Sequence, residues 1–434
     1  SSSGDAGDIN IETGSLTVEN GAQISAQTEA SGEGGDINIS GPEKLNITGD
    51  GEISASTSST GQGGNIELKA TETIDITGNG EISVKTTGAG DAGNISIETP
   101  NLTTDKIEIT ASTEAEGTGG AITAKTDTLT LDNNSQLTVK ADSSSSGDAG
   151  DINIETGSLT VENGAQISAQ TEASGEGGDI NISGPEKLNI TGDGEISAST
   201  SSTGQGGNIE LKATETIDIT GNGEISVKTT GAGDAGNISI ETPNLTTDKI
   251  EITASTEAEG TGGAITAKTD TLTLDNNSQL TVKADSSSSG DAGDINIETG
   301  SLTVAKGTEI SAQTDGSGKG GDINISGPEK LNITGVGQIS ASTSGAGQGG
   351  NIDISAPETI DITGDGEISV KTTGAGNAGN ISIETQNLTT DQIKITASTE
   401  AEGKGGSIKA ETETLNLGCL LYTSDAADEY SRGC

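Results

Sequence analysis

The feature that most constrains this chain is an internal repeat. Residues 1–143 and 144–286 are identical, and a diverged third copy begins at Ser287. Each copy is built from shorter units that open with a glycine, a short polar residue or alanine, and an isoleucine. From the first copy into the second, the opening glycines follow at spacings of 28, 29, 29, 27 and 30 residues: Gly7, Gly35, Gly64, Gly93, Gly120 and Gly150. Fifteen such units start in the chain, which predicts a solenoid and not a set of globular domains.

Every unit contains three short runs in which apolar and polar residues alternate. In the first unit the apolar positions are Ile9/Ile11, Leu16/Val18 and Ile24/Ala26. A period of two is typical of β-strands, and turn residues such as Asn20-Gly21 and Gly41-Pro42 separate the runs. We therefore predict an all-β fold, a right-handed parallel β-helix of about 15 coils. Each coil has 27–30 residues and three short strands that pair with their counterparts one unit on.

Differences between the first and third copies test which positions face inward. Most changed positions are predicted to lie outside or in turns, and several reverse charge: Glu19/Ala305, Asn20/Lys306, Glu33/Lys319, Asp50/Val336, Lys69/Ser355, Glu108/Lys394 and Thr123/Lys409. Among the predicted inward positions we find one change, Leu68 to Ile354, which keeps volume and polarity. The pattern predicts a narrow apolar interior that adjacent coils share, so that a single isolated unit should not fold.

Composition excludes several classes of function. The chain has 67 Asp+Glu against 20 Lys+Arg, a net charge of −47, and no His, Met, Trp or Phe. Without His there is no Ser-His-Asp machinery and no imidazole metal site. A surface this acidic argues against binding to nucleic acid, whose phosphates need a basic face. No stretch approaches the 18 or so consecutive apolar residues that a transmembrane helix requires.

Acidic residues are the abundant reactive groups, so an enzyme interpretation must start from them. Parallel β-helices can carry polysaccharide lyases and hydrolases that use paired carboxylates, and candidates for such pairs on an outward face are Asp8, Asp36, Asp75, Glu52 and Glu81. The alternative is that these are solvated surface charges. We favour the alternative, because the acidic positions recur in every copy, whereas an active site should be singular. We therefore assign no catalytic, cofactor-binding or metal-binding residue and expect no cofactor.

Two further binding functions deserve comparison with the pattern. Calcium-binding nonapeptide repeats need a nine-residue period, whereas here the period is near 28, and the position of Asp36 becomes Asn65, Asn94 and Ala121 in later units. Regular calcium ligation is therefore not expected, although scattered weak binding remains open. Ice-binding β-helices present flat ranks of Thr, but the outward pairs of the third runs include Gln and Lys: Ser25/Gln27, Ser54/Ser56, Ser83/Lys85 and Thr110/Ser112.

The two ends of the chain differ from its body. The sequence begins at an internal point of its own repeat and without an initiator Met, so we expect a fragment of a longer protein. Both Cys, both Tyr and the one Arg lie in residues 419–434. Within that tail, residues 419–429 resemble a translated sequencing adapter, and we interpret the tail as an assembly artefact. The predicted organisation is one repeat rod over 1–418, made of copies 1–143, 144–286 and 287–418, followed by this tail.

The recurring phrase G-x-G-G-[DN]-I-x-I, then L-x-[IV] with a glycine-bearing turn, then I-S-A-x-T, resembles the repeats of filamentous-haemagglutinin-type exoproteins. It is especially similar to large cyanobacterial members of the two-partner secretion class. The resemblance implies a β-helical stalk, secreted or on the bacterial outer cell surface and exported through an outer-membrane barrel partner. Such a stalk serves adhesion, aggregation or a surface layer, with a receptor, a polysaccharide or a neighbouring cell as its partner. A polysaccharide-active β-helix enzyme is the principal alternative, and an ice-binding β-helix is the remote one.

Overall fold

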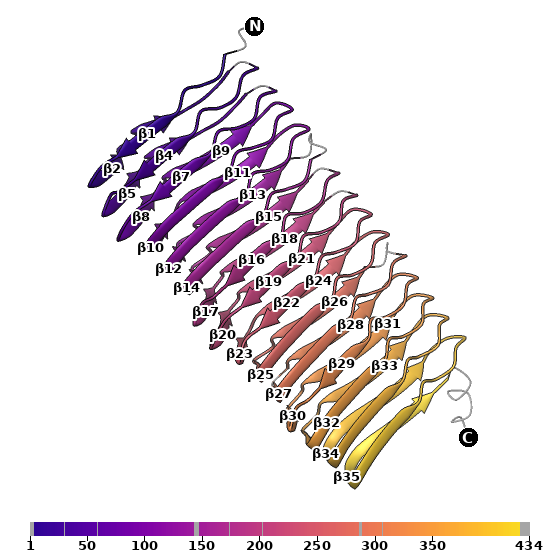
Figure 1. Cartoon of the computed structure of the whole chain (residues 1–434). Helices are drawn as coiled ribbons and strands as arrows, with labels where there is room; N and C mark the ends of the chain where they lie inside the picture. The colour runs from indigo at the N-terminus through magenta and orange to yellow at the C-terminus, as the bar shows by residue number, and fades with distance from the viewer. Residues whose placement is uncertain are drawn as a thin grey trace. The chain divides into compact units, whose positions relative to one another are not determined.

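The computed structural model describes residues 4–425 except 30, 59, 143–146, 173, 202, 286–288 and 306, and the side chains of 419 and 420 are also outside the description. Over these residues the chain is an all-β parallel solenoid of about 14 turns with no helix (Figure 1). Fifteen opening glycines bound fourteen complete turns, which accounts for the difference from the expected 15 coils. The chain divides into two compact units, Ser1–Glu215 with Asn222–Glu224 and Thr216–Gly221 with Ile225–Cys434.

In unit 1 the strands fall into the three predicted positions of the coil. First strands are β1 (Ile9–Glu12), β4 (Ile37–Ser40), β7 (Ile66–Lys69), β16 (Ile180–Ser183) and β19 (Ile209–Lys212). Second strands are β2 (Ser15–Glu19), β5 (Lys44–Gly49), β8 (Thr73–Gly78) and β17 (Lys187–Gly192). Third strands are β3 (Gln23–Ser25), β6 (Glu52–Ser54), β9 (Glu81–Thr86), β11 (Glu108–Thr113), β13 (Gln136–Ala141), β15 (Gln166–Thr171) and β18 (Glu195–Thr200).

The first and second positions merge into one strand in several coils of unit 1. These longer strands are β10 (Ile95–Asp105), β12 (Ile122–Asp132) and β14 (Ile152–Glu162). Strand β10 illustrates the merger, because its first half pairs with β7 and its second half with β8. The number of separate strands therefore varies from coil to coil, while the positions of the pairing residues stay the same.

Unit 2 follows the same plan. Its separate first and second strands are β22 (Ile238–Glu241), β29 (Ile323–Ser326), β20 (Thr216–Gly221), β23 (Asn244–Asp248) and β30 (Lys330–Thr334). Its third strands are β21 (Glu224–Thr229), β24 (Glu251–Thr256), β26 (Gln279–Ala284), β28 (Glu309–Thr314), β31 (Gln338–Thr343) and β33 (Glu367–Thr372). Merged strands are β25 (Ile265–Asp275), β27 (Ile295–Ala305), β32 (Ile352–Thr363), β34 (Ile381–Thr399) and β35 (Ile408–Ser424), the last of which crosses the 418/419 boundary.

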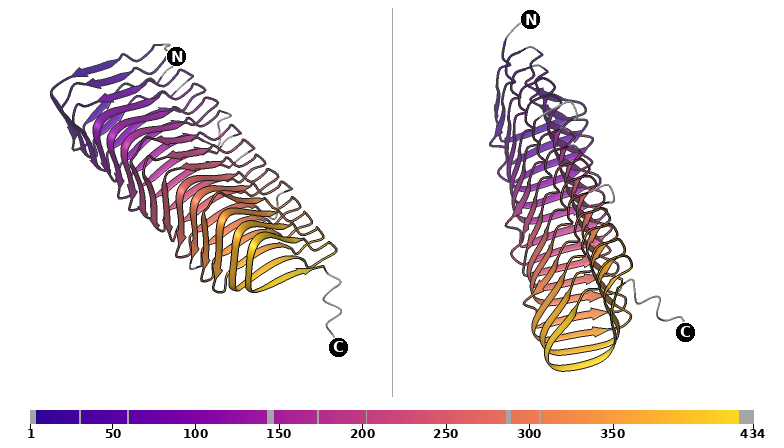
Figure 2. Two further views of the ribbon diagram at one scale, coloured as in Figure 1. Left: turned by 60° about the horizontal axis from the view of Figure 1, so that its bottom comes forward. Right: turned by 90° about the vertical axis from the view of Figure 1, so that its right-hand side faces the viewer.

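The register of the coils confirms the repeat read from the sequence. Ile9 pairs with Ile37, Ile37 with Ile66, Ile66 with Ile95, Ile95 with Ile122 and Ile122 with Ile152, always in parallel. These steps are the spacings of the opening glycines. Each strand therefore pairs with its counterpart one unit on, as predicted. Figure 2 shows the strands of successive coils running side by side, with the last coils wrapping around an interior.

The interior contains the predicted apolar ladder. In the second coil Ile37, Ile39, Leu45, Ile47 and Ile53 are at most 1% exposed, and the intervening residues face outward. The predicted inward change, Leu68 to Ile354, is buried at both positions, and the structure adds a second one, because Ala165 and its equivalent Thr308 are both buried. Apart from two positions, the residues listed above as outward changes are exposed in both copies. Ala305 is 9% exposed, because its short side chain does not reach past its neighbours, and Lys306 lies outside the described residues.

Candidate binding surface

The outward side of the third strands forms a regular surface in each unit, and we call it the third-strand face. The six-residue third strands turn three alternate residues outward, and the parallel register aligns them with the same positions in the next coil. In β9 these residues are Glu81, Ser83 and Lys85. Three columns result: a first one of mainly Glu and Gln, a middle one of Ser and Thr, and a third one of Lys, Ser and Gln.

The middle column lies low between the other two. Ser83 is 6% exposed and Ser168 is 3% exposed, although both are outward positions, because the longer side chains on either side shield them. Thr110 donates a hydrogen bond to Glu108 Oε1 (2.8 Å), and the Oγ atoms of Ser168 and Ser197 are 3.3 Å apart. The middle column therefore forms a floor of hydroxyl groups, with longer polar side chains as walls.

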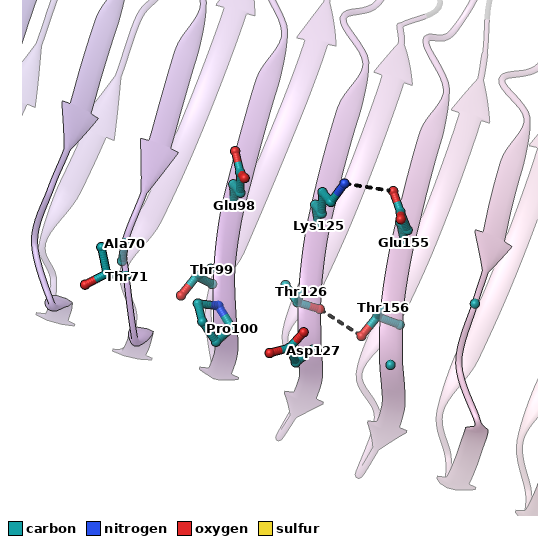
Figure 3. Close-up of a pocket in the computed structure, with 12 residues that line it drawn as sticks. Ala70, Thr71, Glu98, Thr99, Pro100, Lys125, Thr126, Asp127, Glu155 and Thr156 are labelled. Atoms are coloured by element: carbon teal, nitrogen blue, oxygen red, sulfur yellow. Dashed lines mark hydrogen bonds and ion pairs between the residues drawn. The ribbon is translucent and has the colours of Figure 1, made fainter.

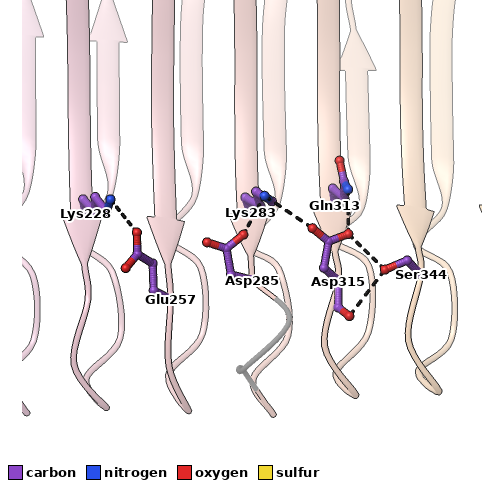
Figure 4. A network of polar contacts seen from close by, with 7 residues as sticks. All are labelled: Lys228, Glu257, Lys283, Asp285, Gln313, Asp315 and Ser344. Atoms are coloured by element: carbon purple, nitrogen blue, oxygen red, sulfur yellow. Dashed lines mark hydrogen bonds and ion pairs between the residues drawn. The ribbon is translucent and has the colours of Figure 1, made fainter.

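Ion pairs join the third column to the coil that follows it. In unit 1, Lys140 Nζ is 2.7 Å from Asp142 Oδ1 and 2.9 Å from Glu172 Oε1. In unit 2, Lys283 Nζ is 2.6 Å from Asp285 Oδ1 and 3.3 Å from Asp315 Oδ2 (Figure 4). These contacts fix the third wall and neutralise part of its charge.

The same contacts shift the pKa values of the groups involved. Hydrogen bonds to Asp142 and Glu172 outweigh burial and raise the pKa of the Lys140 ammonium. Its equivalent Lys283 has a raised pKa for the same reason, with Asp285 as the main partner. Burial opposes ionisation of Asp315, but hydrogen bonds from Gln313, Ser344 and Lys283 outweigh it and lower the pKa of that carboxyl.

The third-strand face has a hollow in each unit. In unit 1 a hollow of about 340 Å³ has Ser83, Thr110, Thr138 and Ser168 as its floor. In unit 2 a hollow of about 410 Å³ has Ser340, Ser369 and Thr396 as its floor, and Tyr422 borders it. Both hollows are polar, and both extend along several coils. The arrangement suits an extended ligand held by hydrogen bonds.

The acidic residues proposed from sequence do not gather at one site. Glu52 and Glu81 stand in adjacent coils in the first column of the third-strand face. Asp75 lies on the outward side of the second strands, between Asn46 and Thr103. Asp8 and Asp36 lie just before the first strands. The five carboxylates thus occupy three separate places on the coil.

Asp8 and Asp36 have a structural role that the sequence did not reveal. Asp8 Oδ1 accepts a hydrogen bond from the backbone N–H of Asp36 (3.0 Å), and Asp36 Oδ1 accepts one from the backbone N–H of Asn65 (2.8 Å). The series continues from Asn94 to Asn65 and ends where Ala121 donates to Asn94. We call this series the Asp/Asn ladder. An amide oxygen accepts as a carboxylate does, which explains why Asp and Asn exchange here.

The same ladder bears on calcium. The Asp36 position uses its Oδ1 atom to bond backbone, and the next two members of the ladder are amides. Among the described residues no group of three or more Cys, Asp and Glu side chains is arranged to hold a metal ion. Ala121 still donates its backbone N–H to Asn94 Oδ1. The change from Asp or Asn to Ala at this position therefore does not remove the last hydrogen bond of the ladder.

A second group of residues was missed from the sequence, the Thr at the end of the third strands. Thr57 and Thr86 are at most 1% exposed and point inward. Their hydroxyls donate to the carbonyl oxygens five residues on, Gln62 (3.1 Å) and Asp91 (3.0 Å). Alternation within I-S-A-S-T places this Thr on the inward side, so the signal was available. These threonines close the glycine-rich loop and are not part of an outward rank that could face ice.

Another hollow, of about 600 Å³, lies at the corner between first and second strands in unit 1 (Figure 3). Two of its carboxylates are paired, since Lys125 Nζ is 3.5 Å from Glu155 Oε2 and Lys69 Nζ is 3.6 Å from Glu98 Oε2. Two of its hydroxyls are paired as well, because Thr126 donates to Thr156 Oγ1 at 2.8 Å and Thr156 donates to the Ser158 carbonyl. These contacts satisfy part of the corner internally.

No protein-family model, no curated protein and no solved structure matches this chain. In the part of the chain that the structure describes, no helix has the length and apolar character needed to cross a membrane.

Proposed function

We propose that this chain is a structural and adhesive segment of a larger exported protein, displayed on a bacterial outer surface or released from it. The observation that carries the proposal is the register of the outer columns. Within each unit, successive coils such as those of β9, β11 and β13 present polar side chains at the same positions. A surface that repeats in this way displays many equivalent weak contacts, and multivalent contact strengthens attachment without a single strong site.

The proposal also includes the handedness of the coil and the number of strands in it. We infer a right-handed coil, because parallel crossovers overwhelmingly take that hand. We also infer that three short strands are the basic plan, which mergers such as β10 modify. Export through an outer-membrane barrel partner, and a receptor, polysaccharide or neighbouring cell as ligand, rest on the resemblance of the repeat phrase to two-partner exoproteins.

Adhesion can be tested with beads that carry the purified chain. Beads coated with folded chain should cluster with bacterial cells or attach to their extracellular matrix more than beads coated with the same chain after irreversible heat unfolding. The comparison keeps composition and charge constant and changes the coil alone. Equal attachment of both bead types would overturn the adhesive proposal.

One observation favours a second candidate, a polysaccharide-active enzyme. Glu52 and Glu81 are in register in adjacent coils, and neighbouring strands lie about 4.8 Å apart. That spacing approaches the roughly 5–5.5 Å that separates the two carboxyl groups of retaining glycosidases. Against it, Glu108 continues the same column, and Glu52 accepts a hydrogen bond from Gln23 at 2.7 Å. Release of reducing ends from acidic or neutral polysaccharides, abolished by Glu81→Gln, would establish this candidate in place of the first.

A further inference from the structure

The hollow of the third-strand face in unit 2 contains an unpaired buried hydroxyl. Thr396 is 4% exposed, lies on the floor of the hollow, and its Oγ1 has no hydrogen-bond partner. A buried hydroxyl without a partner is unfavourable, so such a group calls for an explanation. Ser340, Ser369 and Thr396 precede the 419 boundary, whereas the next position of the middle column is Tyr422, which pairs in register with Thr396 and borders the hollow from the tail.

Comparison with the other copies shows why this hydroxyl is unpaired. At the equivalent coils, Thr110 donates to Glu108 Oε1 (2.8 Å) and Thr253 donates to Glu251 Oε1 (2.9 Å). In the third copy the glutamate is replaced by Lys394, whose ammonium can donate but cannot accept. Lys394 instead bonds Glu367 at 3.2 Å. The substitution frees the floor hydroxyl to bond something else.

The charge of this hollow is balanced, although the chain as a whole has a net charge of −47. Its charged lining residues are Glu367, Lys371, Lys394 and Glu400. Lys394 pairs with Glu367, and Lys371 Nζ is 2.5 Å from Glu400 Oε1. A ligand therefore meets donors and acceptors without a dominant charge of either sign.

We propose that the hollow of unit 2 binds a neutral, linear polysaccharide lying along the coils, a proposal that rests on the adhesive function above. Sugar hydroxyls both donate and accept, which matches the free Thr396 hydroxyl, the Ser floor and the paired walls. A linear polymer fits because β31, β33 and β34 present equivalent outward positions in register. An added peptide strand does not fit, because β33 is already bonded to β31 and β34 on its two edges.

The proposal is tested by affinity electrophoresis of the full chain in gels that contain a soluble, unbranched neutral glucan. The native chain should be retarded, and a gel with a uronic-acid polymer should retard it less. Thr396→Val, which removes the hydroxyl and keeps the shape, should weaken binding about threefold to tenfold. Ser369→Gln, which fills the floor, should abolish the retardation.

Matched controls lie outside the hollow on the same chain. Thr389→Val is in β34 on the outward side of the second-strand position, and Ser382→Gln is in β34 at the first-strand position. Both controls should bind the glucan as the native chain does, and circular dichroism should show that all four variants keep their strands. Absence of retardation by the neutral glucan, retardation unchanged by Thr396→Val and Ser369→Gln, or retardation by the uronic-acid polymer alone would overturn the proposal.

The bead experiment distinguishes the polysaccharide-binding proposal from the adhesive function on which it rests. If coated beads attach to cells but the chain does not bind neutral glucan, the adhesive function is supported and the polysaccharide site is refuted. A chain that binds the glucan at the hollow but does not attach beads to cells leaves the site and removes the adhesive role.

Discussion

The glycine-rich corners and the third-strand face belong to the same coils, yet substitution affects them very differently. At the corner, a Cβ on Gly61 would overlap the carbonyl oxygen of Gly32 one coil earlier, and a Cβ on Gly64 would overlap that of Gly35. On the third-strand face, Glu108 of the first copy becomes Lys394 in the third. The corner therefore sets the spacing of the coils through backbone contact, whereas the outer face can change its chemistry while the coil stays the same.

The largest loss of stability is expected from a substitution in the apolar interior. Ile39 is 1% exposed, so Ile39→Asp would leave a carboxylate unpaired among apolar side chains and should cost about 3–5 kcal/mol. Ile39→Val is the control and should cost about 0.5–1.5 kcal/mol. Denaturant midpoints of the two variants should differ clearly. Similar losses of stability for both variants would show that the interior holds more water than its buried apolar side chains imply.

The corner should respond next. Gly61→Ala forces the new Cβ against the Gly32 carbonyl, and we expect a loss of about 1–3 kcal/mol or more. Gly14→Ala is its matched control, because nothing lies within 4 Å of a Cβ at Gly14. That control should be neutral or slightly stabilising. Thermal melts of both variants measure the difference, and a neutral Gly61→Ala would mean that the corners can move apart at no cost.

The Asp/Asn ladder should contribute less per residue. Asp36→Ala removes the oxygen that accepts the Asn65 backbone N–H, and the expected cost is about 1–2 kcal/mol. Asp36→Asn keeps an acceptor at that position and should remain close to native, as the chain itself does at Asn65 and Asn94. Hydrogen exchange of the Asn65 amide checks the assignment. Equal protection of this amide in both variants would show that the ladder does not stabilise the stacking of the coils.

A smaller, pH-dependent effect is expected at Asp315. The lowered pKa of this carboxyl means that its contribution is present above the unfolded value near 3.8 and is lost as pH falls through the lower folded value. Lys283 acts oppositely, since its raised pKa makes its contribution present below 10.5 and lost at higher pH. Both groups are partly exposed, so Asp315→Asn should cost tenths of a kcal/mol at pH 7 and nothing well below pH 3. Denaturant midpoints at the two pH values provide the measurement.

The smallest effect is expected where the copies already differ. Glu33 is exposed, and its equivalent in the third copy is Lys319. The backbone of Glu33 bonds Asp5 and Thr28, but those bonds do not involve its side chain. Glu33→Lys should therefore change the free energy of unfolding by less than about 0.5 kcal/mol. A loss as large as that of Gly61→Ala would erase the distinction between corner and outer face.

Much of the fold could be predicted from the sequence, because the repeat supplies its own register. Once Gly35 and Gly64 are recognised as equivalent, pairing of Ile37 with Ile66 follows, and alternation assigns their side chains to the interior. The merging of strands in β10 was not predicted. Whether one strand continues through the Thr99-Pro100 corner depends on local backbone angles, which the apolar pattern does not encode.

The candidate surface was harder to predict, because its properties depend on contacts between coils. Asp36 looked like one of many solvated carboxylates, and its bond to the Asn65 amide follows from how the corners stack. The columns of the third-strand face were visible in the sequence, but the recess of Ser83 between its neighbours depends on side-chain length in three coils at once. The unpaired hydroxyl of Thr396 needed both this geometry and the comparison with Thr110.

The register across a copy boundary has a genetic consequence. Ile122 at the end of the first copy pairs with Ile152 at the start of the second, and Ile265 pairs with Ile295 where the third begins. The pairing between consecutive copies is therefore the same at both copy boundaries. Unequal recombination between identical copies would insert or delete five coils together, and every new neighbour would meet a partner it already fits. Length in this architecture can change in whole steps within a single generation, without any round of compensating mutation.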